Sequence, residues 1–121
     1  MTWQRAFGGL SCASSIAAAA YGSHALPSNP LTTPSDIKAW DVASRYQLLH
    51  SFALLSLPSV LPAAHPICCA VSSGLMAGGI LAFSGSCYAK VLTKDERIGK
   101  ITPYGGFALI AAWISIALLR R

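Results

Sequence analysis

Long apolar stretches, separated by two polar loops and one very short turn, dominate the hydrophobicity pattern of this chain. Four of them approach the length of about 20 residues that a helix needs to cross a bilayer: residues 4–25, 46–64, 67–89 and 103–119. The first is the weakest, because it is rich in alanine and serine. The pattern predicts an all-α polytopic membrane protein with four transmembrane helices in an antiparallel bundle, forming a single membrane domain over residues 1–121.

Helix start signals refine two of these segments. Ser35 is a suitable N-cap, and Asp36 suits the positive end of the helix dipole. We therefore expect a short interfacial helical segment before the second span, within the loop 26–45. The other long loop covers residues 90–102, and Thr102 is expected to cap the fourth helix.

Composition and charge support the membrane assignment. The chain is 54% hydrophobic and only 11% charged, whereas soluble domains carry roughly 25% charged residues. The net charge of +5 comes from basic residues at the edges of the apolar segments, without interleaved aromatics, so no nucleic-acid partner is expected. Lys and Arg are more numerous beside the two long loops, which places those loops on the cytoplasmic or matrix side.

The first segment also has the basic start and apolar centre of a signal peptide. We expect it to be retained, because its far end carries polar residues that have a structural interpretation. The four cysteines have neither CxxC nor zinc-type spacing. They are expected to be small apolar packing residues, and the sequence predicts no metal and no cofactor.

Small residues recur at four-residue intervals along two of the segments. Gly74, Gly78 and Ala82 form such a stripe in the third segment, and a similar stripe begins at Gly9 in the first. In lipid, such residues let helices approach closely. We expect the stripe to hold the bundle together; docking onto a helix of another membrane protein is the alternative.

Polar side chains gather at the segment ends that border the two long loops. The candidate cluster comprises His24, Gln47, His50, Ser84, Tyr88 and Tyr104. Gln47, His50 and Ser51 share one helical face, which should point inward because polar groups facing lipid are costly. A hydrogen-bonded network that fixes the bundle is the favoured interpretation. A site for a small molecule or lipid headgroup, or for a metal or haem, is the alternative.

Enzymatic chemistry is not expected. The sequence offers no Ser-His-Asp or Cys-His arrangement supported by a carboxylate, and no phosphate-binding loop. No Asp or Glu lies inside an apolar segment, which also argues against a carboxylate proton relay.

Four stretches resemble one known family in order and spacing: YGSHAL (21–26), SRYQLLHSFALL (44–55), AGGILAFSGSCY (77–88) and ITPYGGFALIAAWISI (101–116). The chain resembles the small membrane proteins of the domain of unknown function 423 family, which includes the animal transmembrane protein 256. Family members usually show Gly-Ala-His where this chain has Gly22-Ser23-His24. The resemblance implies four spans and an uncut N-terminus, and it supplies no reaction.

The resemblance also implies a location, because eukaryotic members are associated with mitochondria and bacterial members with the plasma membrane. We expect a non-catalytic accessory subunit of a mitochondrial inner-membrane respiratory-chain complex, in contact with membrane lipids and other membrane subunits. A stand-alone small transporter, or a lipid- or quinone-binding protein that uses the His-containing polar leaflet, is the alternative. The bacterial plasma membrane is the alternative location.

Overall fold

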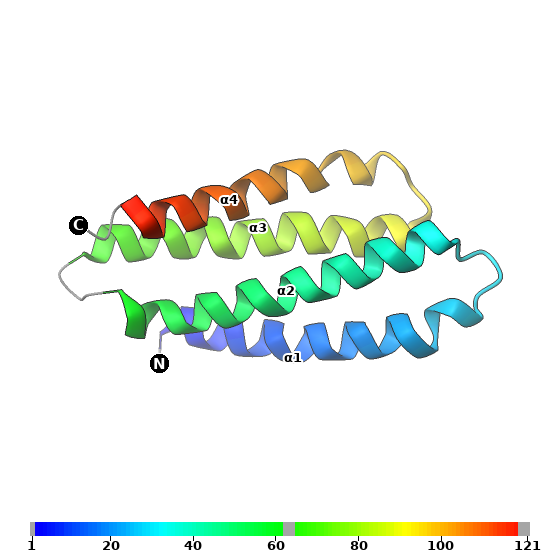
Figure 1. Cartoon of the computed structure of the whole chain (residues 1–121), viewed down its shortest axis with the longest axis horizontal. Coiled ribbons are helices and arrows are strands. Elements are labelled where there is room, and N and C mark those ends of the chain that lie inside the picture. Colours follow the sequence, from blue (N-terminus) through cyan, green and yellow to red (C-terminus); the bar gives the residue numbers. More distant parts are fainter. Residues whose placement is uncertain (1, 62–64, 119–121) are drawn as a thin grey trace.

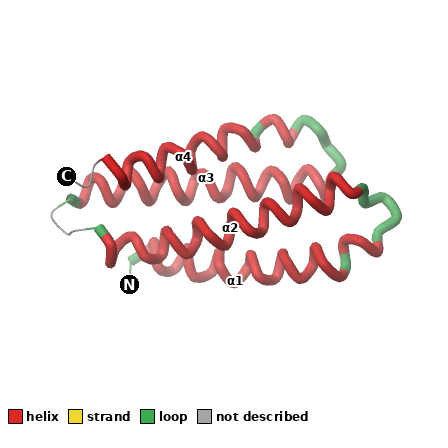
Figure 2. Tube along the Cα trace, in the orientation of Figure 1, coloured by secondary structure: helices red, strands yellow, loops and turns green. Residues whose placement is uncertain are grey.

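A computed structural model describes residues 2–61 and 65–118. Within those residues the chain is all-helical, with four α-helices: α1 (Trp3–His24), α2 (Pro34–Val60), α3 (Pro66–Thr93) and α4 (Thr102–Leu118). The helices lie side by side in chain order and alternate in direction (Figures 1 and 2). We call the end that carries the α1–α2 and α3–α4 connections the loop end, and the opposite end the turn end. The predicted all-α fold is confirmed.

Two segments are long and apolar enough to cross a membrane: Pro66–Thr93 and Ile98–Leu118. Helices α1 and α2 are as long as a span needs, with 22 and 27 residues, but do not reach the same mean hydropathy. Length and composition therefore support a membrane protein and identify two candidate spans.

Helix α2 begins at Pro34, close to the start signal at Ser35 and Asp36, and the interfacial segment and the second span form one continuous helix. The N-cap is Thr33, not Ser35. The Thr33 hydroxyl accepts from the Asp36 amide at 3.1 Å, and the Asp36 carboxylate accepts from the Thr33 amide at 2.9 Å. This capping box satisfies two otherwise unpaired backbone donors and fixes the start of the helix.

The other boundaries also differ from the sequence-based ones. Helix α3 continues to Thr93, so both connections at the loop end are shorter than expected, and each contains one 3-10 turn, Leu26–Ser28 and Ile98–Lys100. Helix α2 ends at Val60, two residues beyond Pro58, and the expected end of that span at residues 62–64 lies outside the described residues.

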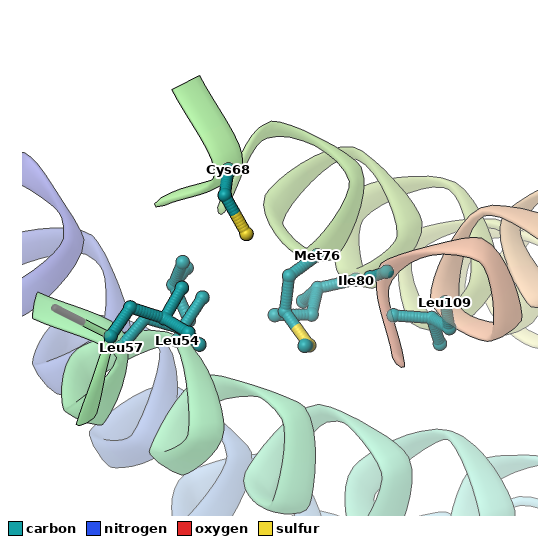
Figure 3. Close-up of a cluster of buried hydrophobic side chains, with 8 residues drawn as sticks. Leu54, Leu57, Cys68, Met76, Ile80 and Leu109 are labelled. Carbon is teal, nitrogen blue, oxygen red and sulfur yellow. The ribbon is translucent and has the colours of Figure 1, made fainter. Parts of the chain in front are cut away.

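An apolar core lies between α2, α3 and α4, and α1 packs Phe7 against its edge. Leu54 and Leu57 of α2 face Met76 and Ile80 of α3, and Leu109 of α4 completes the cluster (Figure 3). The buried residues of α1 are instead polar or glycine: Gln4, Gly8, Ser11 and Ser15. The bundle therefore has an apolar side, formed by the last three helices, and a polar interface between α1 and α2.

Glycines permit the closest helix contacts. A Cβ built on Gly8 of α1 would lie 2.7 Å from Leu55 Cβ of α2, and one on Gly79 of α3 would lie 2.7 Å from Leu109 Cγ. A Cβ on Gly105 of α4 would overlap the backbone of Phe83. These glycines let neighbouring helices approach until backbones nearly touch, as small residues do in membrane bundles.

The predicted packing stripe does not hold this bundle together. Gly74 and Gly78 are exposed, and a Cβ at either position would meet nothing within 4 Å. Ala82 is half-buried, and its backbone lies beside Gly105. Four-residue spacing establishes that such residues share one helix face but not where that face points. It is Gly79, the next residue along, that faces α4.

An ion pair joins two helices at the loop end. Lys94 Nζ, at the end of α3, lies 2.5 Å from Asp36 Oδ2, at the start of α2. The hydrogen bond from Lys94, aided by the Thr33 amide, lowers the pKa of Asp36 to about 2. Because an Asp carboxyl in an unfolded chain has a pKa of about 3.9, the pair stabilises the fold above that pH.

We expect this stabilisation to be lost as the pH falls from about 4 to about 2, because Asp36 then becomes protonated in the folded protein as well. Both side chains are partly exposed, so the loss should be only about 1 kcal/mol. Thermal unfolding in detergent, followed by helical circular dichroism across this pH range, measures it. Lys94→Met should remove most of the acid-dependent step, whereas Arg45→Met, which breaks the more exposed Asp41–Arg45 pair, should not. Equal acid sensitivity in both variants would contradict the assignment.

Candidate functional site

A buried amide on α2 is the centre of a polar network. Gln47 is only 8% exposed. Its Nε2 donates to Ser14 Oγ at 2.8 Å and to the Ser11 carbonyl at 3.1 Å, both on α1. Its Oε1 accepts a 2.7 Å hydrogen bond from the Tyr88 hydroxyl of α3. One side chain thus connects three helices, and both ends of its amide are satisfied.

Ser51, one turn further along α2, extends the network. Its hydroxyl donates to Ser11 Oγ at 2.6 Å, and the same oxygen accepts from Gln47 Nε2 at 3.3 Å. Gln47, His50 and Ser51 are all buried, which confirms the prediction that their shared face points into the protein. The buried polar atoms of this network have partners, as a stable apolar environment requires.

Ser84 and His50 make hydrogen bonds outside this network, although Ser84 lines the groove beside Gln47 and Tyr88 that is described below. Ser84 is buried and donates to the Ala43 carbonyl at 2.8 Å. His50 is hydrogen-bonded through Nδ1 to the Tyr46 carbonyl of its own helix at 2.7 Å and packs against Trp113 of α4.

His24 and Tyr104 also stay apart from the network. His24 is exposed at the end of α1, and Tyr104, near the start of α4, is 73% exposed. Of the six residues, the structure brings only Gln47 and Tyr88 into direct contact.

Ser11 and Ser14 are the network residues that the sequence did not identify. The predicted span boundary near residue 46 places Gln47 at a membrane end of its span, whereas Ser11 and Ser14 lie well inside α1. From Pro34, Gln47 is 47 − 34 = 13 residues along the helix, about 20 Å at 1.5 Å per residue. Gln47 therefore lies at mid-helix, level with Ser11, rather than at a helix end.

A groove opens beside this network, between α1 and α3, with Gln47 of α2 at its base. Its volume is about 440 Å³, within the range of about 300–1,000 Å³ of known ligand sites. Four apolar side chains form one part of its wall: Phe7, Leu10, Ile80 and Leu81. Ser14, Ser84, Gly85 and Tyr88 line the part nearer the loop end. No charged side chain is among its lining residues.

An aromatic cluster closes the bundle above the groove. Trp40 of α2 is 6% exposed and lies between the rings of Tyr21 and Tyr88, at centroid distances of 5.2 and 4.6 Å. Its Nε1 donates to the Ala18 carbonyl at 2.6 Å. A Cβ on Gly22 would overlap the Trp40 ring. The glycine of the Gly22-Ser23-His24 motif thus has a packing role, since it admits this indole.

No metal-binding group emerges from the parts of the chain that the structure describes, where no three His, Cys, Asp or Glu side chains lie together. His24 and His50 do not converge on one centre: the first is exposed at the end of α1, and the second is buried against α4. The absence of enzymatic activity remains a prediction.

Comparison with known proteins identifies the family. The profile described as "Protein of unknown function (DUF423)" matches residues 18–106. The chain belongs to the DUF423 family. UPF0382 membrane protein SAB0533 of Staphylococcus aureus is 32% identical over 111 residues, covering 92% of this chain and 88% of the relative. UPF0382 membrane protein YwdK of Bacillus subtilis is 29% identical over 112 residues, covering 92% and 89%. No solved structure matches the chain.

These relatives support a membrane location for this DUF423 protein. Both are bacterial proteins that are named as membrane proteins, and the match runs along most of each chain. The expectation of a mitochondrial inner membrane and a respiratory-chain complex finds no support among them. The bacterial plasma membrane, the alternative location, is favoured instead.

Proposed function

We propose that this DUF423 protein crosses the bacterial plasma membrane four times. Helices α1 and α2 have low mean hydropathy because their polar side chains, such as Ser11, Gln47 and Ser51, face other helices and not the surroundings. Their outward faces carry apolar side chains, including Leu10, Ile16 and Phe52. Polar groups inside and apolar groups outside suit a lipid-exposed helix.

Within this frame, we propose that the protein is a non-catalytic binding protein for an apolar molecule with an uncharged polar head. The groove between α1 and α3 carries the proposal. It has the volume of a ligand site, apolar walls and a small set of hydrogen-bonding groups at one end, which is the usual make-up of small-molecule sites. Binding is proposed rather than transport, because the lining residues cover only part of the bundle's length.

Two glycines on the same helix give a matched test. Gly85 lines the groove, whereas Gly78 does not, and a Cβ at either position would meet nothing within 4 Å. Gly85→Leu should fill the groove without disturbing the fold, while Gly78→Leu should leave the groove open. Purification in a mild detergent, followed by mass spectrometry of retained lipids, should detect an apolar molecule with the wild type and Gly78→Leu but not with Gly85→Leu. Equal retention by all three, or by none, would overturn the proposal.

A second candidate function is that of an accessory subunit of a larger membrane assembly. The outward position of Gly74 and Gly78 on α3 supports it, because exposed small residues let a helix of another protein approach closely. Migration of the wild type with a large complex on a native gel, lost in Gly78→Leu and kept in Gly85→Leu, is the result expected for this function. Migration of the wild type as a small free species would oppose it.

A further inference from the structure

We infer that the groove between α1 and α3 selects a long-chain alcohol, with its hydroxyl at Tyr88 and Ser14 and its hydrocarbon tail between Phe7 and Leu81. This inference rests on the proposed function and specifies the chemistry of the ligand's head. It follows from three features of the groove: its lack of charge, the hydrogen-bonding capacity that its network leaves unused, and the direction in which its polarity changes.

The first feature excludes a charged head. The lining residues are apolar, glycine, serine, glutamine or tyrosine, with no Lys, Arg or His among them. A carboxylate or phosphate placed beside Gln47 would have no cation to pair with, and burying an unpaired charge is far more costly than burying a neutral polar group. The site therefore suits an uncharged head.

The second feature distinguishes a hydroxyl from a carbonyl or an ether. The protons of Tyr88 and Ser14 are already donated, to Gln47 Oε1 at 2.7 Å and to the Ser11 carbonyl at 3.0 Å. Gln47 Nε2 is used as well, by Ser14 and Ser11. What these groups retain is the capacity to accept, through free lone pairs on Tyr88 Oη and Ser14 Oγ. An ether or carbonyl oxygen can use only the Ser11 hydroxyl, the one lining donor that the network leaves free, whereas a ligand hydroxyl can also donate to Tyr88 and Ser14.

A ligand hydroxyl fits both oxygens. Tyr88 Oη and Ser14 Oγ each hydrogen-bond the same Gln47 amide, so one hydroxyl between them could donate to either. The same hydroxyl can also accept a proton from Ser11, whose Oγ accepts from Gln47 and Ser51 and is thereby left to donate.

The third feature orients the ligand. Helices α1 and α3 both run toward the loop end (Figure 1). Along α1 the lining changes from Phe7 and Leu10 to Ser14, and along α3 it changes from Leu81 to Tyr88. Both walls therefore become more polar in the same direction. A lipid whose head lies toward the loop-end face and whose tail points into the bilayer also becomes more polar toward the loop end, so it matches the groove.

Three probes of similar length but different heads test the inference: hexadecanol, methyl hexadecyl ether and hexadecanoate. Their affinities for the full-length protein in detergent micelles can be compared by native mass spectrometry and by thermal stabilisation. We expect hexadecanol to bind at least tenfold more tightly than the other two, and Gly85→Leu to lose all binding. Equal affinity for hexadecanol and the ether, with both lost in Gly85→Leu, would overturn the alcohol inference while the proposed function stands. Failure of all three probes to bind the wild type would overturn both.

Two variants of the acceptor groups locate the hydroxyl. Ser14→Ala removes one acceptor and keeps the bonds from Gln47 to Ser11, and Tyr88→Phe removes the other. Each should reduce the preference for hexadecanol over the ether severalfold, with the affinity for the ether unchanged. Because Tyr88→Phe also removes a bond to Gln47, its fold is checked by circular dichroism, and Ser14→Ala provides the independent measurement. An unchanged preference in a folded Ser14→Ala variant would contradict the assigned position.

Discussion

Replacing Gly105 with alanine is expected to weaken the packing of α4 on α3 severely. The added Cβ would overlap the backbone nitrogen of Phe83 and lie 2.7 Å from the carbonyl carbon of Ala82. These are backbone atoms of a helix, so no change of rotamer relieves the clash, and the helices must move apart. Overpacking typically costs about 1–3 kcal/mol. We expect the free energy of unfolding to fall by an amount at the upper end of that range. Unfolding in mixed micelles of a mild detergent and sodium dodecyl sulfate measures it.

The next residue provides the control. A Cβ on Gly106 would meet only the Phe83 ring, at 3.7 Å, which is ordinary contact. Both substitutions replace glycine with alanine in the same helix, so each gains about 1 kcal/mol of helix propensity. Gly106→Ala should therefore be neutral or stabilising. If the two variants unfolded alike, the close approach of α3 and α4 at Gly105 would be disproved.

Replacing Gln47 with leucine should be the most damaging change on the polar side of the bundle. It removes the hydrogen bonds that join α2 to Ser11 and Ser14 of α1 and to Tyr88 of α3, and it leaves the Tyr88 hydroxyl without its acceptor. In a membrane protein one interhelical hydrogen bond is worth about 0.6 kcal/mol on average and up to about 1.7. Because Gln47 makes several such bonds, we expect the free energy of unfolding to fall by about 2–3 kcal/mol in the same assay.

Ser56→Ala is the matched control for this change. Ser56 also lies in α2, but its hydroxyl donates only to the Phe52 carbonyl of its own helix, at 2.8 Å. Its removal should cost less than about 0.5 kcal/mol, in keeping with a bond that joins no two helices. A Gln47→Leu variant as stable as Ser56→Ala would mean that the network does not hold the bundle together.

The two predictions concern two different interfaces of the bundle, one between α3 and α4 and one that joins α1 to α2 and α3. On the α2–α3–α4 side, close approach at glycines and an apolar core hold the helices. On the α1 side, hydrogen bonds centred on Gln47 add to the close approach of Gly8 to α2. In the proposed four-span arrangement, hydrogen bonds suit this interface, because in lipid apolar side chains gain little by leaving the surroundings for the interior. The groove lies on the polar side, where α1 and α3 both border Gln47.

Several features follow from the sequence alone, because they depend on local order. The alternation of apolar segments and breaks predicts four antiparallel helices, and the structure has them. The three- and four-residue spacing of Gln47, His50 and Ser51 predicts a shared inward face, and all three are buried. A helix imposes these relations between residues three and four apart in the chain, without reference to the rest of the fold.

Other features were decided only by tertiary structure. The sequence joined His24 and Tyr104 to Gln47 because all lie near expected segment ends. In the structure Gln47 lies at mid-helix in α2, beside Ser11, whereas His24 and Tyr104 are exposed near the ends of α1 and α4. Depth in a bundle depends on where each helix begins and how its neighbours are staggered, and local pattern does not contain that information.

The rotation of α3 about its own axis was also decided only by tertiary structure, as its glycines show. Periodicity establishes that Gly74 and Gly78 share a face, yet that face points outward, while Gly79 and Gly105 form the contact between α3 and α4. One residue along a helix turns the side-chain direction by about 100°. The sequence thus determined which residues of this protein lie on one helix face, and only the packing of four helices decided which face meets a neighbour, because that choice depends on contacts between residues far apart in the chain.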